Sequence, residues 1–113
     1  MRAYVAFAVL TASGCDSAEI RVCNDSGHDF TSLEWGHGAT IEPLATGACT
    51  AYVAPHEDVY RYTFFRAVVG QDVFEIRPID YVGETPLDPG RWTYQLTIAD
   101  YDGRLLNLET VRD

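Results

Sequence analysis

The side chains of this sequence that could do chemistry are three histidines, three cysteines and a scattered set of carboxylates. His28, His37 and His56 all fall in expected loops, at separations of 9 and 19 residues. No two of them have the close spacing that would place both on one element as a prepared metal site. We therefore expect surface histidines, with a histidine-based metal-binding or enzymatic role as the alternative.

The sequence contains no G-x-S-x-G, no H-E-x-x-H and no glycine-rich phosphate loop. A cysteine nucleophile paired with a histidine would have to use Cys23 or Cys49. Asp100-Tyr101-Asp102-Gly103 has the composition of the middle of a calcium loop, but the twelfth position, Val111, lacks the glutamate that such a loop needs. We expect neither an enzyme nor a bound metal or cofactor.

The first 14 residues have the pattern of an export signal. Arg2 is the only charge before Asp16, and Ala3 to Leu10 is an unbroken apolar run followed by small residues. This run is too short to cross a bilayer, which needs about 20 apolar residues. The alternative, a first strand or core helix, leaves the abrupt change to polar residues after Cys15 unexplained.

The exit sequence Ala12-Ser13-Gly14-Cys15 resembles the lipobox of bacterial lipoproteins. In that family the chain is cut before the cysteine, and a diacylglycerol is attached to its sulfur. The resemblance implies a signal peptide at residues 1–14, lipid attachment at Cys15 and a mature chain of residues 15–113 anchored in the cell envelope. Ala12 and Gly14 also fit an ordinary signal peptidase site, so plain secretion stays open.

The odd number of cysteines agrees with lipid attachment. If Cys15 carries lipid, Cys23 and Cys49 remain, in a compartment where disulfides persist. Our hypothesis is that they pair, closing a loop of about 25 residues. Two unpaired thiols are the alternative.

Charge narrows the range of partners. The mature chain would keep seven arginines and no lysine against 17 carboxylates, a net charge of −10. Nucleic acid is not an expected partner, because binding it requires a basic surface. Anionic lipid would also repel the domain, so attachment must come from the acyl chains on Cys15. The first expected strand begins three residues after Cys15, a reach of at most about 11 Å.

Alternating apolar and polar residues, separated by turn residues, predict about seven strands in a single domain. The segments are Ala18–Asn24, Phe30–Trp35, Ala48–Val53, Val59–Val69, Asp72–Pro78, Arg91–Ala99 and Arg104–Val111. In Val59–Val69 the apolar face changes near Phe64-Phe65, which predicts a β-bulge; a helix is the alternative there. Asp102-Gly103 predicts a hairpin between the last two strands.

The number and spacing of these strands predict an all-β fold. We expect an antiparallel β-sandwich that resembles immunoglobulin-like domains, with a small barrel as the alternative. Exposed tyrosines such as Tyr60, Tyr62 and Tyr81 could form a binding face for an envelope protein partner, although aromatic residues also fill cores. We therefore expect a lipid-anchored, non-enzymatic binding module of the envelope. The alternatives are a histidine-based accessory protein of the periplasm and a purely structural surface protein.

Overall fold

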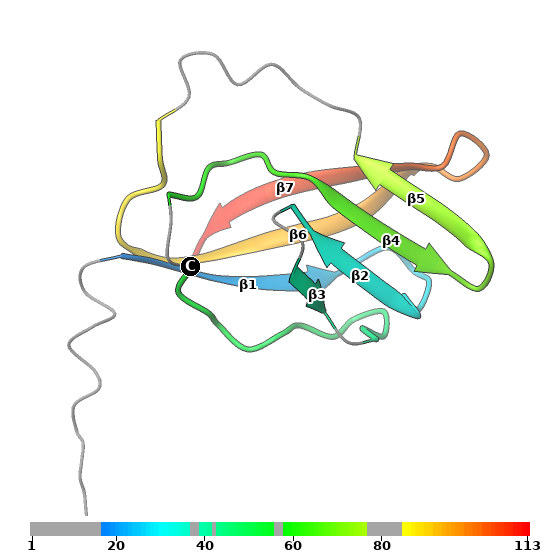
Figure 1. The fold of residues 1–113 in the computed structure, drawn as a ribbon, viewed down its shortest axis with the longest axis horizontal. Helices are drawn as coiled ribbons and strands as arrows, with labels where there is room; N and C mark the ends of the chain where they lie inside the picture. Colours follow the sequence, from blue (N-terminus) through cyan, green and yellow to red (C-terminus); the bar gives the residue numbers. More distant parts are fainter. Residues whose placement is uncertain (1–16, 37–38, 42, 56–57, 77–84) are drawn as a thin grey trace, which may run out of the picture.

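The computed structural model describes residues 17–36, 39–41, 43–55, 58–76 and 85–113. All regular structure within these ranges is β-strand, which confirms the all-β prediction (Figure 1). The strands are β1 (Ala18–Asn24), β2 (Ser32–Trp35), β3 (Ala39–Ile41), β4 (Phe65–Val69), β5 (Asp72–Ile76), β6 (Gly90–Asp100) and β7 (Leu105–Arg112).

The seven strands form one mixed sheet in the order β1-β6-β7-β5-β4-β2-β3, curved into a half-barrel. One limb contains β1, β6 and β7, and the other contains β5, β4, β2 and β3. The limbs are joined where β5 pairs with β7 through only two residue pairs, Glu75 with Leu105 and Ile76 with Leu106. This short junction lets the sheet turn so that its two limbs enclose the core.

The antiparallel pairing that we predicted is wrong for two strand pairs. β1 runs parallel to β6 along its full length, and β5 runs parallel to β7. A single sheet also replaces the two separate sheets of the expected sandwich. Alternation in a sequence identifies the buried face of a strand, but it carries no information about which neighbour the strand takes or in which direction. Parallel neighbours need a long connection, and along the sequence the four strands β2 to β5 separate β1 from β6.

The core fills the space between the limbs. Along β1 the alternate residues Ala18, Ile20, Val22 and Asn24 are buried, and along β6 Tyr94 and Leu96 are fully enclosed. Phe65 of β4 contacts Tyr94 edge-on across the core, with ring centroids 5.7 Å apart. Such contacts between the limbs hold the curved sheet closed.

Strand boundaries mostly follow the predictions. β1 matches its predicted range, and β5, β6 and β7 match within one or two residues. The predicted hairpin at Asp102-Gly103 connects β6 to β7. β4 begins only at Phe65, so the predicted bulge near Phe64-Phe65 does not lie within a ladder. Phe64 is exposed and Phe65 is buried, which is the ordinary alternation of an extended chain rather than a change of face.

Two segments differ more. β3 was not predicted, because Gly36 and Gly38 end the preceding strand and Pro43 follows closely. The predicted strand Ala48–Val53 is present only as two isolated antiparallel bridges to β1, from Cys49 to Cys23 and from Val53 to Ile20. This segment, which we call the edge segment (residues 48–53), thus lies beside β1 on the side opposite β6.

Candidate functional site

A disulfide bond joins Cys23 of β1 to Cys49 of the edge segment, which confirms the predicted pairing; their Cα atoms are 4.0 Å apart. The pair is flanked by two backbone hydrogen bonds: the amide of Asn24 donates to Ala48 O at 2.9 Å, and the amide of Thr50 donates to Val22 O at 2.9 Å. The two cysteines therefore occupy a non-hydrogen-bonded position, where antiparallel strands approach most closely. The register of the edge segment against β1 positions the bond.

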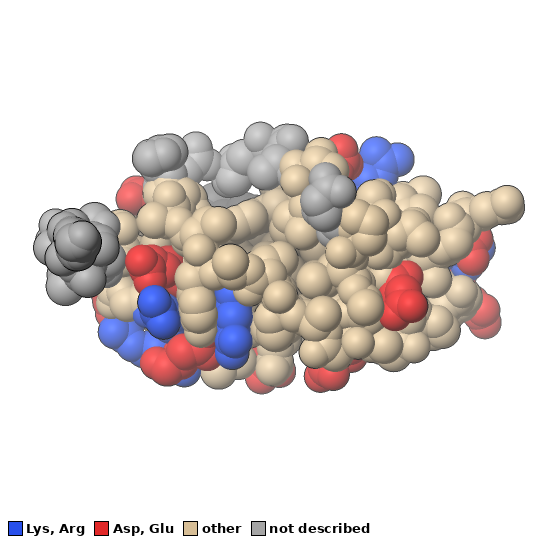
Figure 2. Space-filling view, turned by 90° about the horizontal axis from the view of Figure 1, so that it is seen from below, with Lys and Arg blue, Asp and Glu red and all other residues tan. Residues whose placement is uncertain are grey.

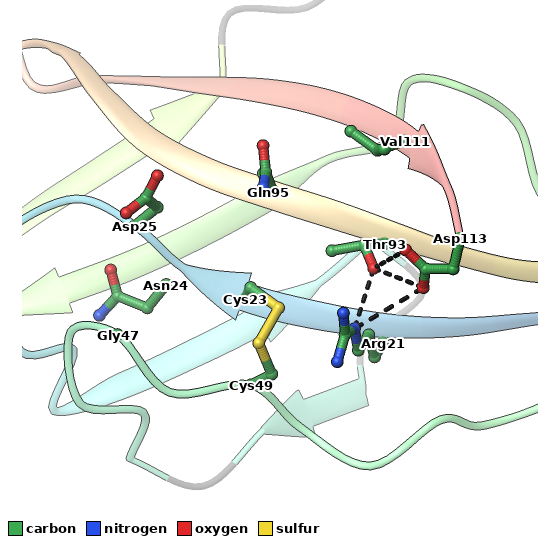
Figure 3. Close-up of a pocket in the computed structure, with 10 residues that line it drawn as sticks. All are labelled: Arg21, Cys23, Asn24, Asp25, Gly47, Cys49, Thr93, Gln95, Val111 and Asp113. Atoms are coloured by element: carbon green, nitrogen blue, oxygen red, sulfur yellow. Dashed lines mark hydrogen bonds and ion pairs between the residues drawn. A yellow bond between two sulfur atoms is a disulfide. The ribbon is translucent and has the colours of Figure 1, made fainter.

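An open groove with a volume of about 290 Å³ lies beside this disulfide, on the outer face of β1 and β6 (Figure 3). Both cysteines contribute to its wall. The lining residues are Arg21, Cys23, Asn24, Asp25, Gly47, Cys49, Thr93, Gln95, Val111 and Asp113. This volume is at the lower end of the range of ligand pockets, about 300–1,000 Å³.

One end of the groove is built from a polar cluster. Thr93 Oγ1 lies 2.9 and 2.7 Å from the two carboxylate oxygens of Asp113, and Arg21 Nε donates to Thr93 Oγ1 at 2.9 Å. Arg21 Nε also lies 3.7 Å from Asp113 Oδ2, and the hydroxyl of Tyr52 donates to the same carboxylate oxygen. The cluster thereby connects the edge segment to β1, β6 and the residue after β7.

The hydrogen bond between Tyr52 and Asp113 shifts both titrations. It holds the pKa of Asp113 below its ordinary value of 3.8, assisted by the hydrogen bond with Thr93 and the nearby guanidinium of Arg21. The same bond, with burial and the negative charge of Asp113, raises the pKa of Tyr52 above 10.0. At neutral pH the pair is therefore a neutral phenol donating to a carboxylate.

Two guanidinium groups contact the ring of Tyr52. The Cζ atoms of Arg21 and Arg91 lie 5.2 and 4.6 Å from its centroid, and Arg91 Nε lies 3.0 Å from Glu19 Oε1. Cation–π contacts and ion pairs thus compensate both arginines. Figure 2 shows arginine and carboxylate groups intermixed over one end of the displayed face, rather than a patch of one sign.

Of the three tyrosines predicted to form a binding face, the structure describes Tyr60 and Tyr62. Tyr60 is half-buried, and its carbonyl accepts a hydrogen bond from the hydroxyl of Tyr94. Tyr62 is 39% exposed, and Phe64, two residues further on, is 40% exposed. Tyr81 lies outside the described residues. The described surface therefore offers an aromatic pair, Tyr62 and Phe64.

The other predicted sites fall largely outside the described residues. Cys15 lies there, as do His37 and His56, while His28 is exposed and its ring is 5.1 Å from that of Tyr101. Among residues 17–113 that the structure describes, no group of three or more potential metal ligands is found. In the described part of the chain, no helix is long and apolar enough to span a membrane.

Sequence reasoning did not find the polar cluster. The sequence did indicate that Arg21 and Thr93 occupy polar positions of two strands that were predicted correctly. Their proximity depends on the parallel register that places Arg21 opposite Thr93, and alternation does not encode this register. The cluster was therefore unpredictable without the topology.

Comparison with known proteins gave no relative: no protein-family model, curated protein or solved structure matches this chain.

Proposed function

We propose that this chain is a lipid-anchored protein of the bacterial cell envelope, with a non-enzymatic β-domain that binds another envelope protein near the membrane. Residues 1–14 would be its signal peptide, and Cys15 would carry the acyl chains. The proposal places the domain on the periplasmic or external side of a membrane, with nucleic acid excluded as a partner by the strong negative charge.

The observation that carries this proposal is the Cys23–Cys49 disulfide. Disulfides persist in exported proteins and are rare in reducing compartments. The bond uses two of the three cysteines and leaves Cys15, the residue that ends the lipobox-like sequence, as the odd one. A lipid on that sulfur accounts for the unpaired cysteine.

Geometry also supports a domain held close to the membrane. β1 starts at Ala18, and Ser17 already belongs to the folded part, since its carbonyl accepts a hydrogen bond from the amide of Gly90 at 3.4 Å. Two residues of chain from Cys15 to Ser17 span at most about 7 Å. A lipid on Cys15 would therefore keep the start of β1 next to the headgroups.

Intact mass of the protein purified from the membranes of its own host tests the anchor. We expect a mass equal to residues 15–113 plus acyl chains, increasing by the two hydrogens of a reduced disulfide after treatment with a reductant. An unmodified mass for residues 15–113, or cleavage at another site, would refute the lipid anchor and favour a freely secreted domain.

The binding role is supported by the exposed pair Tyr62 and Phe64, because exposed aromatic residues supply large contact areas at interfaces. Chemical cross-linking in host membranes, followed by purification, should yield a saturable protein partner. Tyr62→Ser with Phe64→Ser should lose that partner, while Val53→Ser, at a residue that is 50% exposed and belongs to the edge segment, should retain it. Equal capture by both variants would place the interface elsewhere.

For the fold, we propose that the two limbs correspond to the two layers of an immunoglobulin-like sandwich that remain joined through β5 and β7. The two-pair junction supports this proposal. The amide protons at that junction should exchange with solvent faster than those within β6 and β7.

A further inference from the structure

The disulfide bond lies at the border of the sheet rather than inside the core. Cys23 belongs to the outer face of β1 and is half-buried, and Cys49 is exposed on the edge segment. Both residues also line the groove, so the chain leaves the bond open to solvent. Exposed disulfides are more readily exchanged than enclosed ones, because a thiolate has to reach a sulfur along the axis of the bond.

The surroundings of the two sulfurs differ. Cys49 lies in the edge segment, which pairs with β1 through two isolated bridges, whereas Cys23 lies within β1, between β6 and that segment. Figure 3 shows the bond extending from β1 out to Cys49, with the side chain of Arg21 beside it. Cys49 is the more exposed of the two residues, and Cys23 shares its face of β1 with Arg21.

Arg21 is placed to favour a thiolate on Cys23. The two residues share the outer face of β1, with Cα atoms about 7 Å apart for two residues of strand, and both line the groove. A nearby guanidinium lowers the pKa of a thiol. Asp113 at 3.7 Å offsets part of this charge, and Asp25 also lines the groove, so the effect of Arg21 should be modest.

We propose that the Cys23–Cys49 bond is a thiol–disulfide exchange site, and that its partner is a cysteine thiolate of another exported protein, which reaches the bond from the groove. The incoming thiolate attacks Sγ of Cys49 and forms a mixed disulfide. The bond between the two protein sulfurs breaks, and its electron pair leaves on Sγ of Cys23, on the face of β1 that also carries Arg21.

A second thiolate of the partner completes the exchange. It attacks the partner sulfur of the mixed disulfide, the partner leaves as an oxidised disulfide, and Cys49 leaves as a thiolate. Two partner thiols are oxidised and two sulfurs of this chain are reduced. The two protons lost by the partner thiols balance those taken up by Cys23 and Cys49. This inference rests on the proposed export of the chain but not on a lipid at Cys15.

Reduced glutathione, a small peptide thiol, is the probe for this site. The protein is purified from its host, free thiols are blocked with iodoacetamide, and glutathione is added at several concentrations under native conditions. Acid quenching and peptide mapping then follow the bond. We expect a rate that increases linearly with glutathione concentration and a first adduct on Cys49.

Variants of Arg21 test the cation. Arg21→Gln should slow the exchange about threefold and Arg21→Lys should restore most of the rate, because a cation favours the leaving thiolate. Arg66→Gln, at an exposed arginine of β4 on the other limb, should leave the rate unchanged. Thermal unfolding of each variant shows whether the fold is retained.

Three results would overturn the proposal. A rate that reaches a plateau at the rate of global unfolding would mean that the folded protein does not exchange. A first adduct on Cys23 would reverse the assignment of the two sulfurs. Equal rates for wild type and Arg21→Gln would remove the role of the cation.

Discussion

Asn24, the last residue of β1, is only 1% exposed and is the polar side chain on which the first loop depends. Its Nδ2 donates to the carbonyls of His28 and Leu44, both at 2.8 Å. Its Oδ1 accepts from the amide and the hydroxyl of Ser26, at 3.0 and 2.7 Å. One amide group thus links β1 to two loops. Asn24→Asp keeps the accepting oxygen and replaces only the donating NH₂ group.

The expected cost of Asn24→Asp follows from these contacts. Two hydrogen bonds donated by Nδ2 are lost, at about 0.5–1.5 kcal/mol each. A carboxylate would also face two carbonyl oxygens in a buried position, which raises its pKa; a shift of about two units corresponds to about 3 kcal/mol. We expect the free energy of unfolding to fall by about 4–6 kcal/mol at pH 7, a large part of the about 5–15 kcal/mol typical of a domain.

This cost should depend on pH with a definite sign. The folded pKa of the new carboxyl is raised above its unfolded value of about 3.9. Its penalty is therefore small below pH 3.9 and grows as pH rises through the folded pKa. Asn24→Ala loses all four hydrogen bonds but introduces no charge, so its cost should not depend on pH.

Urea unfolding at pH 4.5 and pH 7 measures both variants against wild type. We expect the loss in free energy of unfolding caused by Asn24→Asp to be about 2 kcal/mol smaller at pH 4.5 than at pH 7. The loss caused by Asn24→Ala should be the same at both pH values. If Asn24→Asp is as stable as wild type at pH 7, or if its deficit is the same at both pH values, the assignment of Nδ2 to the two carbonyls is wrong.

Three further predictions concern the disulfide, the polar cluster and the core. Cys23→Ala with Cys49→Ala removes a cross-link between residues 26 apart and should lower the free energy of unfolding by about 3.5 kcal/mol in urea titrations, because the unfolded chain gains freedom; an unchanged urea midpoint would contradict this. Asp113→Asn should return the pKa of Tyr52 toward 10.0, measured by tyrosinate absorbance. In wild type, the stability that Asp113 contributes should be lost as pH falls through its folded pKa, which lies below 3.8. The stability that Tyr52 contributes should be lost as pH rises through its folded pKa, which lies above 10.0. Asp113→Asn should show neither loss, and identical pH profiles of stability for the two proteins would count against the hydrogen bond. Phe65→Ala, at a fully buried ring, should cost about 3–5 kcal/mol in the same urea assay, and a cost below about 1 kcal/mol would mean that the limbs do not pack through this ring.

Features that depend on neighbouring residues were predictable from the sequence. Alternation placed Ile20 and Val22 of β1 in the core, and it did the same for Tyr94 and Leu96 of β6. Asp102-Gly103 correctly marked the turn between β6 and β7. These signals work because strand faces and tight turns are determined within a few residues of chain.

Features that depend on the choice of neighbour were not predictable. Nothing local to β1 indicates that it pairs in parallel with β6, and this pairing brings Arg21 to Thr93. The cysteine pair was the exception, because a chain with three cysteines offers few possible pairs. The edge segment failed as a predicted strand because only two of its residues form bridges to β1.

The two neighbours of β1 also imply an order of assembly. Each residue of β1 meets a residue of β6 that lies 72 positions further along the chain, whereas Cys23 and Cys49 are 26 apart. Contacts between distant residues form slowly, because a long loop must close first. We expect the cross-link to form before β6 docks during oxidative folding, so that β1 is already held beside the edge segment when its parallel neighbour arrives. Quenching at intervals by alkylation should then reveal a species with the disulfide formed and the amides of β6 still unprotected.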